Sequence, residues 1–309
     1  MKIQLYIAFF ILLIVCGILY KKITTHNDNT DEMICVKIKH NLDKSPNPIL
    51  WIFVPYELNP RTWESFGSRN TYELGQPYLT HTVKSIIKNS ADNFNVILID
   101  DKSFAKIIPN WTIELSKLQD PIKKNIRSLA MAKLLYLYGG MVVPISFLAM
   151  EPLIHLYTRG IKNGGIFMCE TMNRTLSSNQ TPFVPSIEFM GAEKNNNDVS
   201  KLINYLQVHI STDNTEDTKF VGGVGEFMKN NITIVDGMYI GTKTVDTKPI
   251  LIDDLLSDNF INFYEGMFGI WLPSEDILNR VQYNWFATMS EEDILDGTFI
   301  LSKYFILTK

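Results

Sequence analysis

A strand–helix–strand pattern in the first third of the chain constrains the fold more than any other feature. Ile49–Val54 (ILWIFV) is a short apolar run closed by a proline, and Phe94–Ile99 is a second run that ends at a pair of aspartates. Between them Pro77 can begin a helix, on which apolar residues recur at helical spacing, namely Leu79, Val83, Ile86 and Ile87. Two such strands joined by a helix predict a parallel pair and therefore an α/β domain.

The pattern continues along the chain. Pro121 can begin the next helix with Asp120 as its cap, an apolar stripe follows, and Gly139-Gly140 supplies a left-handed stop. We predict further strands at Met141–Val143, Ile166–Cys169 and Ile187–Met190, and a helix at Asp198–Ile210. The C-terminal third is expected to alternate short strands with Gly- and Asp-rich loops before a final helix over Glu291–Ile306. Residues 49–309 are thus predicted to form one α/β domain with a mostly parallel sheet in its amino half.

The first residues of the chain have a different character. Ile3–Tyr20 is almost entirely apolar, with no charge between Lys2 and Lys21. Such a stretch spans roughly 27 Å as a helix, at about 1.5 Å per residue, which suits a thin hydrocarbon core. A cleaved signal peptide is the alternative, although bulky residues stand where a small-x-small cleavage site is expected. We predict a single-pass membrane anchor over residues 1–22, followed by a polar stalk over residues 23–48.

The flanking charges leave the side of the membrane open. Lys2 and the amino terminus oppose Lys21 and Lys22, so the positive charges nearly balance. Four N-glycosylation sequons favour a lumenal body; they begin at Asn110, Asn173, Asn179 and Asn231.

Composition and charge exclude several classes of protein. Aromatic residues make up 12% of the chain, too many for an intrinsically disordered protein. The net charge of −4 provides no basic surface for a nucleic-acid backbone. Of the three cysteines, Cys16 lies in the predicted anchor, so Cys35 and Cys169 are the only possible pair, and we expect reduced thiols. Heavy use of Asn, Ile and Lys suits an A/T-rich genome such as that of a large DNA virus.

Few motifs that carry chemistry are present. The five histidines are scattered, and we interpret them as surface or core residues rather than metal ligands. Phosphate-loop, dinucleotide and G-x-S-x-G patterns are missing, and Gly222–Gly225 is interpreted as a turn. Open parallel sheets bind ligands outside the carboxyl ends of their strands. At that edge Asp100 and Asp101 either contact a ribose or base, or cap the next turn.

Three segments of the chain resemble one family of enzymes. They are Trp51–Phe53, Val96–Asp101 (VILIDD) and Leu134–Gly140 (LLYLYGG), the last followed by a β run. In order and spacing they are similar, over roughly residues 49–153, to DxD-containing glycosyltransferases of the capsular-polysaccharide and initiating α-mannosyltransferase type. Weaker resemblances to the family extend to Pro182–Glu193, Leu272-Pro273, Tyr283–Phe286 (YNWF) and Ile294-Leu295. The resemblance implies a GT-A fold, an α/β sandwich that binds a nucleotide-sugar, with donor-binding roles for Asp100, Asp101, Arg127, Gly139 and Gly140.

The resemblance ends where the family binds its metal. There the double glycine leads through a short strand into Asp-x-Asp, whose carboxylates hold the divalent ion that bridges the diphosphate. In this chain Pro144 and Ser146 stand in those two places, and Ser128 and Met131 replace an Asp and an Arg of the preceding helix. Because Mg²⁺ and Mn²⁺ prefer charged oxygen ligands, we predict that this chain holds no metal.

Two functions from different classes therefore stay open. The first is a membrane-anchored transferase that binds a nucleotide-sugar without metal and stabilises the diphosphate with basic side chains, the candidates being Lys102, Arg127 and Lys133. Carboxylates that could act as its base are Glu170, Glu188, Glu226 and Asp236. The second is a non-catalytic scaffold that keeps the fold to bind a glycan or a protein. An unrelated anchored α/β domain is a third interpretation, and the site rather than the fold must decide.

Overall fold

The computed structural model describes residues 46–56, 74–174, 178, 181–212, 217–229 and 232–309. The chain divides into two compact units, and Pro46–Lys309 is the unit to which all of these residues belong. The predicted anchor and nearly all of the predicted stalk lie outside the described residues and stay predictions. Within the described part, no helix combines the length and the apolar character that crossing a membrane requires.

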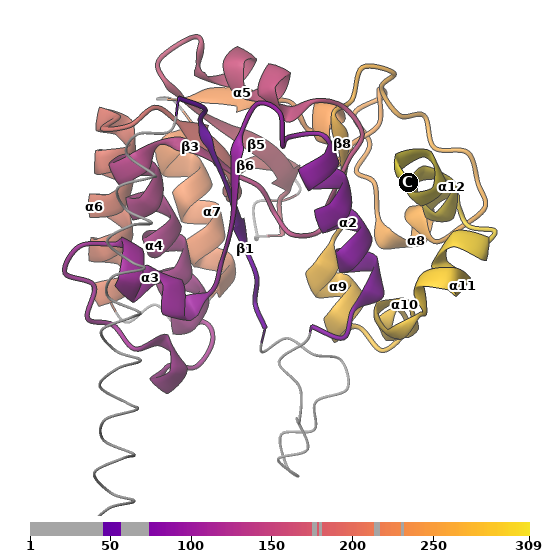
Figure 1. The fold of residues 1–309 in the computed structure, drawn as a ribbon, viewed down its shortest axis with the longest axis horizontal. Helices are drawn as coiled ribbons and strands as arrows, with labels where there is room; N and C mark the ends of the chain where they lie inside the picture. Colours follow the sequence, from indigo (N-terminus) through magenta and orange to yellow (C-terminus); the bar gives the residue numbers. More distant parts are fainter. Residues whose placement is uncertain (1–45, 57–73, 175–177, 179–180, 213–216, 230–231) are drawn as a thin grey trace, which may run out of the picture. The chain divides into compact units, whose positions relative to one another are not determined.

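A six-stranded sheet runs through this unit in the order β2-β1-β3-β6-β5-β7 (Figure 1). Its strands are β1 (Ile49–Phe53), β2 (Asn95–Ile99), β3 (Gly140–Val142), β5 (Ile166–Met172), β6 (Phe183–Ala192) and β7 (Thr233–Val235). The pairs β1–β2, β1–β3 and β5–β7 are parallel, whereas β6 runs antiparallel to both β3 and β5. Five of these strands therefore share one direction, and the predicted α/β class with a mostly parallel sheet is confirmed.

The strand–helix–strand unit at the start of the body is also confirmed. β1 and β2 pair in register from Ile49 opposite Asn95 to Phe53 opposite Ile99. The helix between them is α2 (Pro77–Lys88), and Pro77 lies in its first turn, where a missing N–H leaves no hydrogen bond unmade. The side chains of β1 are almost all buried, as expected for an inner strand of a parallel sheet.

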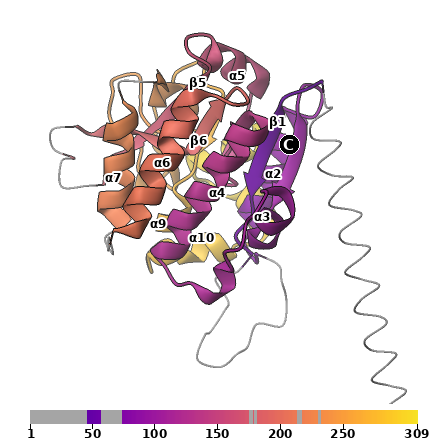
Figure 2. The same cartoon turned by 90° about the vertical axis from the view of Figure 1, so that its left-hand side faces the viewer.

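Helices cover both faces of the sheet. On one face α4 (Ile122–Tyr138), α6 (Asn197–Ser211) and α7 (Asp217–Met228) lie side by side (Figure 2). On the other face α2 and α5 (Leu153–Ile161) contribute to one apolar core with the strands, which includes Leu50, Ile52, Ile86, Leu153 and Phe167. The short helices α3 (Asp101–Ile107) and η2 (Leu115–Lys117) connect β2 to α4.

The last part of the chain differs from its prediction. Besides β7 and the 3₁₀ turn η3 (Gly237–Ile240), residues 232–309 hold one strand, β8 (Gly269–Trp271), which pairs antiparallel with β4 (Phe147–Ala149). The remainder consists of loops, notably over residues 241–251 and 256–268, and of short helices instead of the expected strands, namely α8 (Ile252–Leu255), α9 (Ser274–Asn279), α10 (Asn284–Thr288), α11 (Glu291–Asp296) and α12 (Ile300–Thr308). These helices pack around buried side chains that include Tyr78, Phe286 and Phe305, so tertiary contacts stabilise them.

Two local predictions in this half were wrong. The expected helix over Glu291–Ile306 is interrupted after α11, because Phe299 is extended and the Ser302 hydroxyl donates to the Ile294 carbonyl. The glycine run at 222–225 lies inside α7 and is not a turn. A Cβ on Gly225 would lie 3.1 Å from the Pro185 carbonyl oxygen, so glycine allows α7 to pack closely on β6. That contact offsets the cost of about 1 kcal/mol for glycine in a helix.

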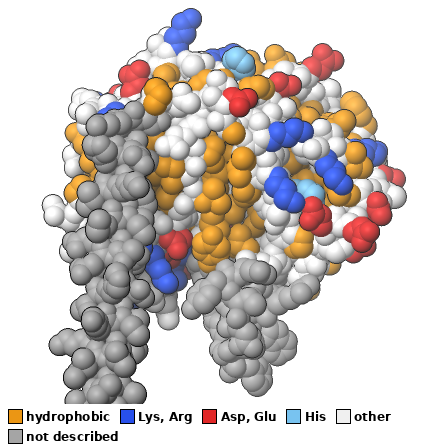
Figure 3. All heavy atoms as spheres, in the orientation of Figure 1, with side chains coloured by type: hydrophobic (Ala, Val, Ile, Leu, Met, Phe, Trp, Pro, Cys, Tyr) orange, Lys and Arg blue, Asp and Glu red, His pale blue; other side chains and the backbone are white. Residues whose placement is uncertain are grey.

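The surface carries charges of both signs. Figure 3 shows basic and acidic side chains interspersed with apolar ones, without an extended patch of one sign on the described part of that face. Lys84, for example, lies 3.3 Å from Glu291. This distribution follows from the nearly balanced composition of 29 basic and 33 acidic residues.

Candidate functional site

The carboxyl edge of the sheet gathers polar residues from several strands. Because β1, β2, β3, β5 and β7 share one direction, their carboxyl ends meet at one edge, where β6 begins. Asp100 follows β2, Pro144 follows β3, Asn173 follows β5 and Asp236 follows β7. We therefore placed each predicted site residue relative to this edge.

Asp100 caps a helix. It is the N-cap of α3, and its carboxylate accepts a hydrogen bond from the Ser103 amide at 2.9 Å. The Ser103 hydroxyl in turn accepts from the Asp100 amide at 3.1 Å and completes a capping box. Of the two roles considered for Asp100, the cap is present in the structure, while a ligand contact stays a prediction.

Asp101 and Arg127 come together at this edge. Arg127 Nε donates to Asp101 Oδ1 at 2.8 Å and Nη2 donates to Oδ2 at 2.6 Å, so the pair is bidentate. The guanidinium also lies over the Phe53 ring, 5.0 Å from its centroid. Arg127 is 8% exposed. Its positive charge is therefore balanced within the protein before any ligand arrives.

Gly139 and Gly140 lie at the opposite, amino end of β3. Both have positive φ, and a Cβ on Gly140 would lie only 2.0 Å from the Ile49 carbonyl oxygen. The Gly139 carbonyl accepts a hydrogen bond from Trp51 Nε1 at 3.0 Å. These glycines end α4 and allow β3 to meet β1, and the structure does not bring them together with Asp101 and Arg127.

Pro144 and Ser146 lie in the turn between β3 and β4. The Pro144 carbonyl accepts from the Phe147 amide at 3.0 Å. Ser146 is 1% exposed, and its hydroxyl donates to the Leu272 carbonyl at 2.8 Å, while the Leu272 amide donates back to the Ser146 carbonyl at 3.1 Å. Ser146, which the resemblance sets in the second place of Asp-x-Asp, thus forms a buried link to the segment after β8.

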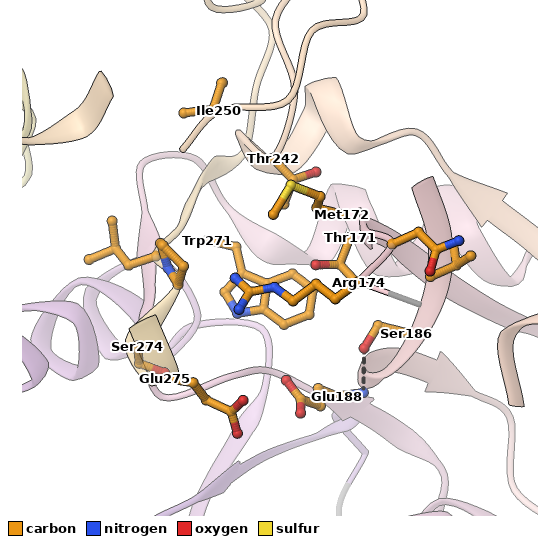
Figure 4. A pocket seen from close by; sticks show the side chains of 14 residues that line it. Thr171, Met172, Arg174, Ser186, Glu188, Thr242, Ile250, Trp271, Ser274 and Glu275 are labelled. Carbon is orange, nitrogen blue, oxygen red and sulfur yellow. Dashed lines mark hydrogen bonds between the residues drawn. The ribbon is translucent and has the colours of Figure 1, made fainter. Parts of the chain in front are cut away.

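Next to this link lies a pocket of about 180 Å³ (Figure 4). Its walls come from the end of β5, the first half of β6, the loop after η3, and the end of β8 with the segment that follows it. The lining residues are Thr171, Met172, Asn173, Arg174, Val184, Ser186, Glu188, Thr242, Ile250, Trp271, Leu272, Pro273, Ser274 and Glu275. Because Leu272 is hydrogen-bonded to Ser146, the pocket adjoins Ser146. Asp101, Arg127 and Ser146 are themselves absent from the lining, so this pocket does not bring them together.

The arginine of the pocket is held by an aspartate. Arg174 Nη1 donates to Asp276 Oδ1 at 2.8 Å and Nη2 donates to Oδ2. These hydrogen bonds raise the pKa of the Arg174 guanidinium above its ordinary value. Arg280 Nε also lies 3.0 Å from Asp276. On the other wall, Lys124 pairs with Glu275 at 2.7 Å. These three cations equal in number the carboxylates of Asp276, Glu275 and Glu188, the last of which also lines the pocket.

A second charged cluster supports the pocket from behind. Lys243 is 7% exposed and lies 2.7 Å from Glu170 and 3.0 Å from Asp236. Burial opposes the charge on Lys243, but its hydrogen bonds to the two carboxylates outweigh it and the pKa of the ammonium is raised. The hydroxyl of Thr242, a lining residue, donates to the Glu170 carbonyl at 2.9 Å. This cluster holds the wall in place.

The remaining candidates are dispersed. Of the four carboxylates suggested as a base, Glu188 lines the pocket, Glu170 and Asp236 bind Lys243, and Glu226 lies on α7. Lys102 is exposed on α3, and Lys133 lies over the Trp111 ring at 5.6 Å. Among the described residues, no group of three His, Cys, Asp or Glu side chains is arranged to hold a metal ion.

Comparisons with known proteins leave the family open. No family model matches the sequence, and no curated protein matches it significantly. Among solved structures the chain is similar to one titled "PaToxG Glycosyltransferase", with 12% identity, a TM-score of 0.32, and coverage of 66% of this chain and 79% of that chain. A match at this level establishes neither the fold family nor the function.

Little in the sequence predicts the pocket. Arg174, Glu188 and Trp271 come from three segments, and no local spacing connects them. Glu188 stood among four possible bases without any reason to prefer it. The usable signals were two of the weaker resemblances, Pro182–Glu193 and Leu272-Pro273, both of which prove to be part of the pocket wall.

Proposed function

We propose that this chain is a glycosyltransferase-like protein with a GT-A-like fold that binds a saccharide-containing ligand in the pocket beside Ser146 and has lost metal-dependent transfer. Three matched segments over residues 49–153 and the mostly parallel sheet support the fold. The predicted anchor over residues 1–22 makes membrane attachment part of the proposal. Extraction of membranes with alkaline carbonate tests that part, and release of the full chain would contradict it.

The observation that carries the proposal is the Ser146–Leu272 link. A divalent ion at the diphosphate needs charged oxygen ligands. Pro144 offers only its backbone carbonyl, which accepts from Phe147, and the Ser146 hydroxyl is buried and donates to Leu272. Ser146 therefore holds the segment that forms the pocket wall, and neither residue supplies a charged oxygen ligand for a metal ion.

The pocket has the chemistry that sugar rings require. Trp271 is half-buried and packs edge-on against Phe189, with 5.9 Å between the ring centroids. Around it are hydroxyl, amide and carboxylate groups, including those of Thr171, Ser186 and Glu188. A saccharide has weakly polar C–H faces and a rim of hydroxyls, and an aromatic wall beside a few polar groups suits such a ligand.

A transferase that works without metal is the second candidate. It is favoured by Glu188, an exposed carboxylate inside the pocket that could accept a proton from an acceptor hydroxyl. The charges of the described residues speak against it. Arg127 is paired with Asp101, and around the pocket three cations, Arg174 among them, face three carboxylates, so no excess of positive charge awaits a leaving diphosphate.

Thermal unfolding of the full chain with added ligand tests the proposal. A ligand at a hundred times its Kd stabilises the folded state by about 2.7 kcal/mol, which corresponds to roughly 5–10 °C in Tm for a domain of this size. We expect such a shift with a saccharide-containing ligand. We also expect no release of UDP or GDP from UDP-glucose or GDP-mannose, with or without Mn²⁺. Mn²⁺-dependent release would contradict the loss of transfer.

A further inference from the structure

The charges around the pocket disfavour a phosphate-bearing ligand. Glu188 and Glu275 both line the pocket, and both act electrostatically on Arg174. Figure 4 shows these two glutamates on the same side of the pocket, below Trp271 in that view. The single arginine in the lining shares Asp276 with Arg280, and Lys124 pairs with Glu275, so three cations face the three carboxylates of Asp276, Glu275 and Glu188. The described residues around the pocket therefore offer a diphosphate no excess of positive charge.

The neighbouring edge does not compensate for this. Arg127 is the predicted donor-binding cation nearest the ends of β1 and β2, and it is bound at two nitrogens by Asp101. To hold a phosphate it would have to leave a buried bidentate pair and its contact with Phe53. That exchange would leave the half-buried Asp101 carboxylate without its cation, which is unfavourable.

The size of the pocket points the same way. Its volume is about 180 Å³, whereas pockets that enclose ligands of the size of a drug or cofactor measure roughly 300–1,000 Å³. A whole nucleotide-sugar would extend out of the pocket, as would the rest of a glycan. One six-membered ring with its hydroxyls suits the smaller space.

We propose that the ligand of this pocket is one uncharged sugar residue of a glycan, and not a nucleotide-sugar. This inference rests on the proposed function, since it assigns the ligand class of the same pocket. Trp271 supplies the flat wall against which a sugar ring lies. The Glu188 carboxylate accepts hydrogen bonds from ring hydroxyls, and hydrogen bonds to an ionised acceptor are stronger than neutral ones. Ser186, whose hydroxyl accepts from the Glu188 amide at 3.2 Å, holds that residue in position (Figure 4).

The test measures binding to the full chain by isothermal titration, in a detergent without a sugar headgroup. The neutral probes are maltotriose, mannotriose and chitotriose, and the nucleotide probes are UDP-glucose and GDP-mannose, each with and without Mn²⁺. We expect at least one trisaccharide to bind with one site per chain. We expect neither nucleotide-sugar to bind more tightly than that trisaccharide.

Glu188→Gln makes the test specific, because the two ligand classes respond in opposite directions. The substitution keeps the shape of the side chain and removes its charge. A neutral saccharide loses a charge-assisted hydrogen bond, and we expect at least tenfold weaker binding. A nucleotide-sugar would lose a repulsion and bind more tightly. The matched control is Glu265→Gln, which removes the charge of an exposed glutamate in a turn that does not line the pocket; it should leave both affinities unchanged.

Ser274→Trp adds a second variant that fills the pocket and leaves Glu188 in place. It should abolish saccharide binding while the Tm without ligand stays near that of the wild type. If a nucleotide-sugar binds and Glu188→Gln strengthens it, the inference is overturned but the proposed function survives. If no probe of either class binds, both are overturned. Trisaccharide binding that is unaffected by Glu188→Gln and Ser274→Trp also overturns the inference, because the ligand then lies elsewhere.

Discussion

Ser146→Asp introduces a carboxylate where the resemblance expects the second aspartate of Asp-x-Asp, and the structure predicts that it damages the fold without creating a metal site. The Ser146 side chain is 1% exposed and donates to the Leu272 carbonyl at 2.8 Å. An aspartate there would be a buried carboxylate facing a carbonyl oxygen, so a hydrogen bond becomes a repulsion. An uncompensated buried charge costs about 3–5 kcal/mol, a large share of the roughly 5–15 kcal/mol that stabilises a typical protein.

Milder substitutions at the same turn provide reference values for the loss of stability. Ser146→Ala removes only the donor and should cost about 1–3 kcal/mol. Pro144→Asp should cost less than about 1 kcal/mol of stability. Pro144 is half-buried and is the first residue of a turn in which its carbonyl accepts a hydrogen bond from the Phe147 amide, and aspartate is favoured at this turn position. Ser302→Ala is the matched control, since its hydroxyl makes the same kind of buried bond, to the Ile294 carbonyl, far from the pocket.

Two assays are needed. Urea unfolding of the full chain measures the stability of each variant, and a separate Mn²⁺ titration of the folded variants, followed by electron paramagnetic resonance, measures metal binding. We expect the order of stability to be wild type, Pro144→Asp, Ser146→Ala and then Ser146→Asp. We also expect the double variant, which combines Pro144→Asp with Ser146→Asp, to bind no Mn²⁺ at micromolar concentrations. A Ser146→Asp protein as stable as the wild type, or a double variant that binds Mn²⁺, would refute the view that this residue has become part of the framework.

Three further predictions follow from individual residues. Burial lowers the pKa of His81 from its ordinary value of 6.5, despite nearby Glu291, so the unfolded chain binds a proton that the folded chain excludes. The urea midpoint should therefore rise with pH between about pH 5 and pH 7, and His81→Gln should lose most of this pH dependence. An unchanged pH dependence in His81→Gln would exclude this cause. Gly140→Ala should lower the free energy of unfolding by roughly 4 kcal/mol or more, because its Cβ would lie 2.0 Å from a carbonyl oxygen. Gly164 also has positive φ but faces open space, so Gly164→Ala should lower it by only about 1–2 kcal/mol. Equal losses in unfolding experiments would contradict this. Burial raises the pKa of the Cys169 thiol well above its ordinary value, so peptide mass spectrometry should find it alkylated only after unfolding, and labelling of the native protein would be the contrary result.

The amino half of the fold could be predicted because its segments carry long, regular patterns. The apolar run at Ile49–Val54 and the helical stripe before Gly139 each determine one element, and parallel strands with a crossover helix leave few arrangements. Residues 232–309 could not be predicted in the same way. Helices of four to nine residues show little periodicity, and their stability depends on burying side chains such as Phe286 and Phe305 against residues far away in sequence.

The candidate site shows the same division. Asp101 was expected at the carboxyl edge because it follows a predicted strand, and it lies there. Arg127, to which the resemblance gives a donor-binding role, pairs with it. The pocket depends on the second sheet, in which β4 pairs with β8 across more than a hundred residues of sequence. No spacing in the sequence indicates that Trp271 lies beside Glu188. Their proximity follows from strand pairing, which is a tertiary property.

A crystal structure of the full chain with the best-binding neutral trisaccharide would test the central claim most directly. The proposal predicts one sugar residue inside the pocket, lying against Trp271 with hydroxyls within hydrogen-bonding distance of Glu188, and an intact link between Ser146 and Leu272. A ligand bound instead over Phe53 and Arg127, or an Mn²⁺ ion with a nucleotide-sugar at Pro144, would contradict it.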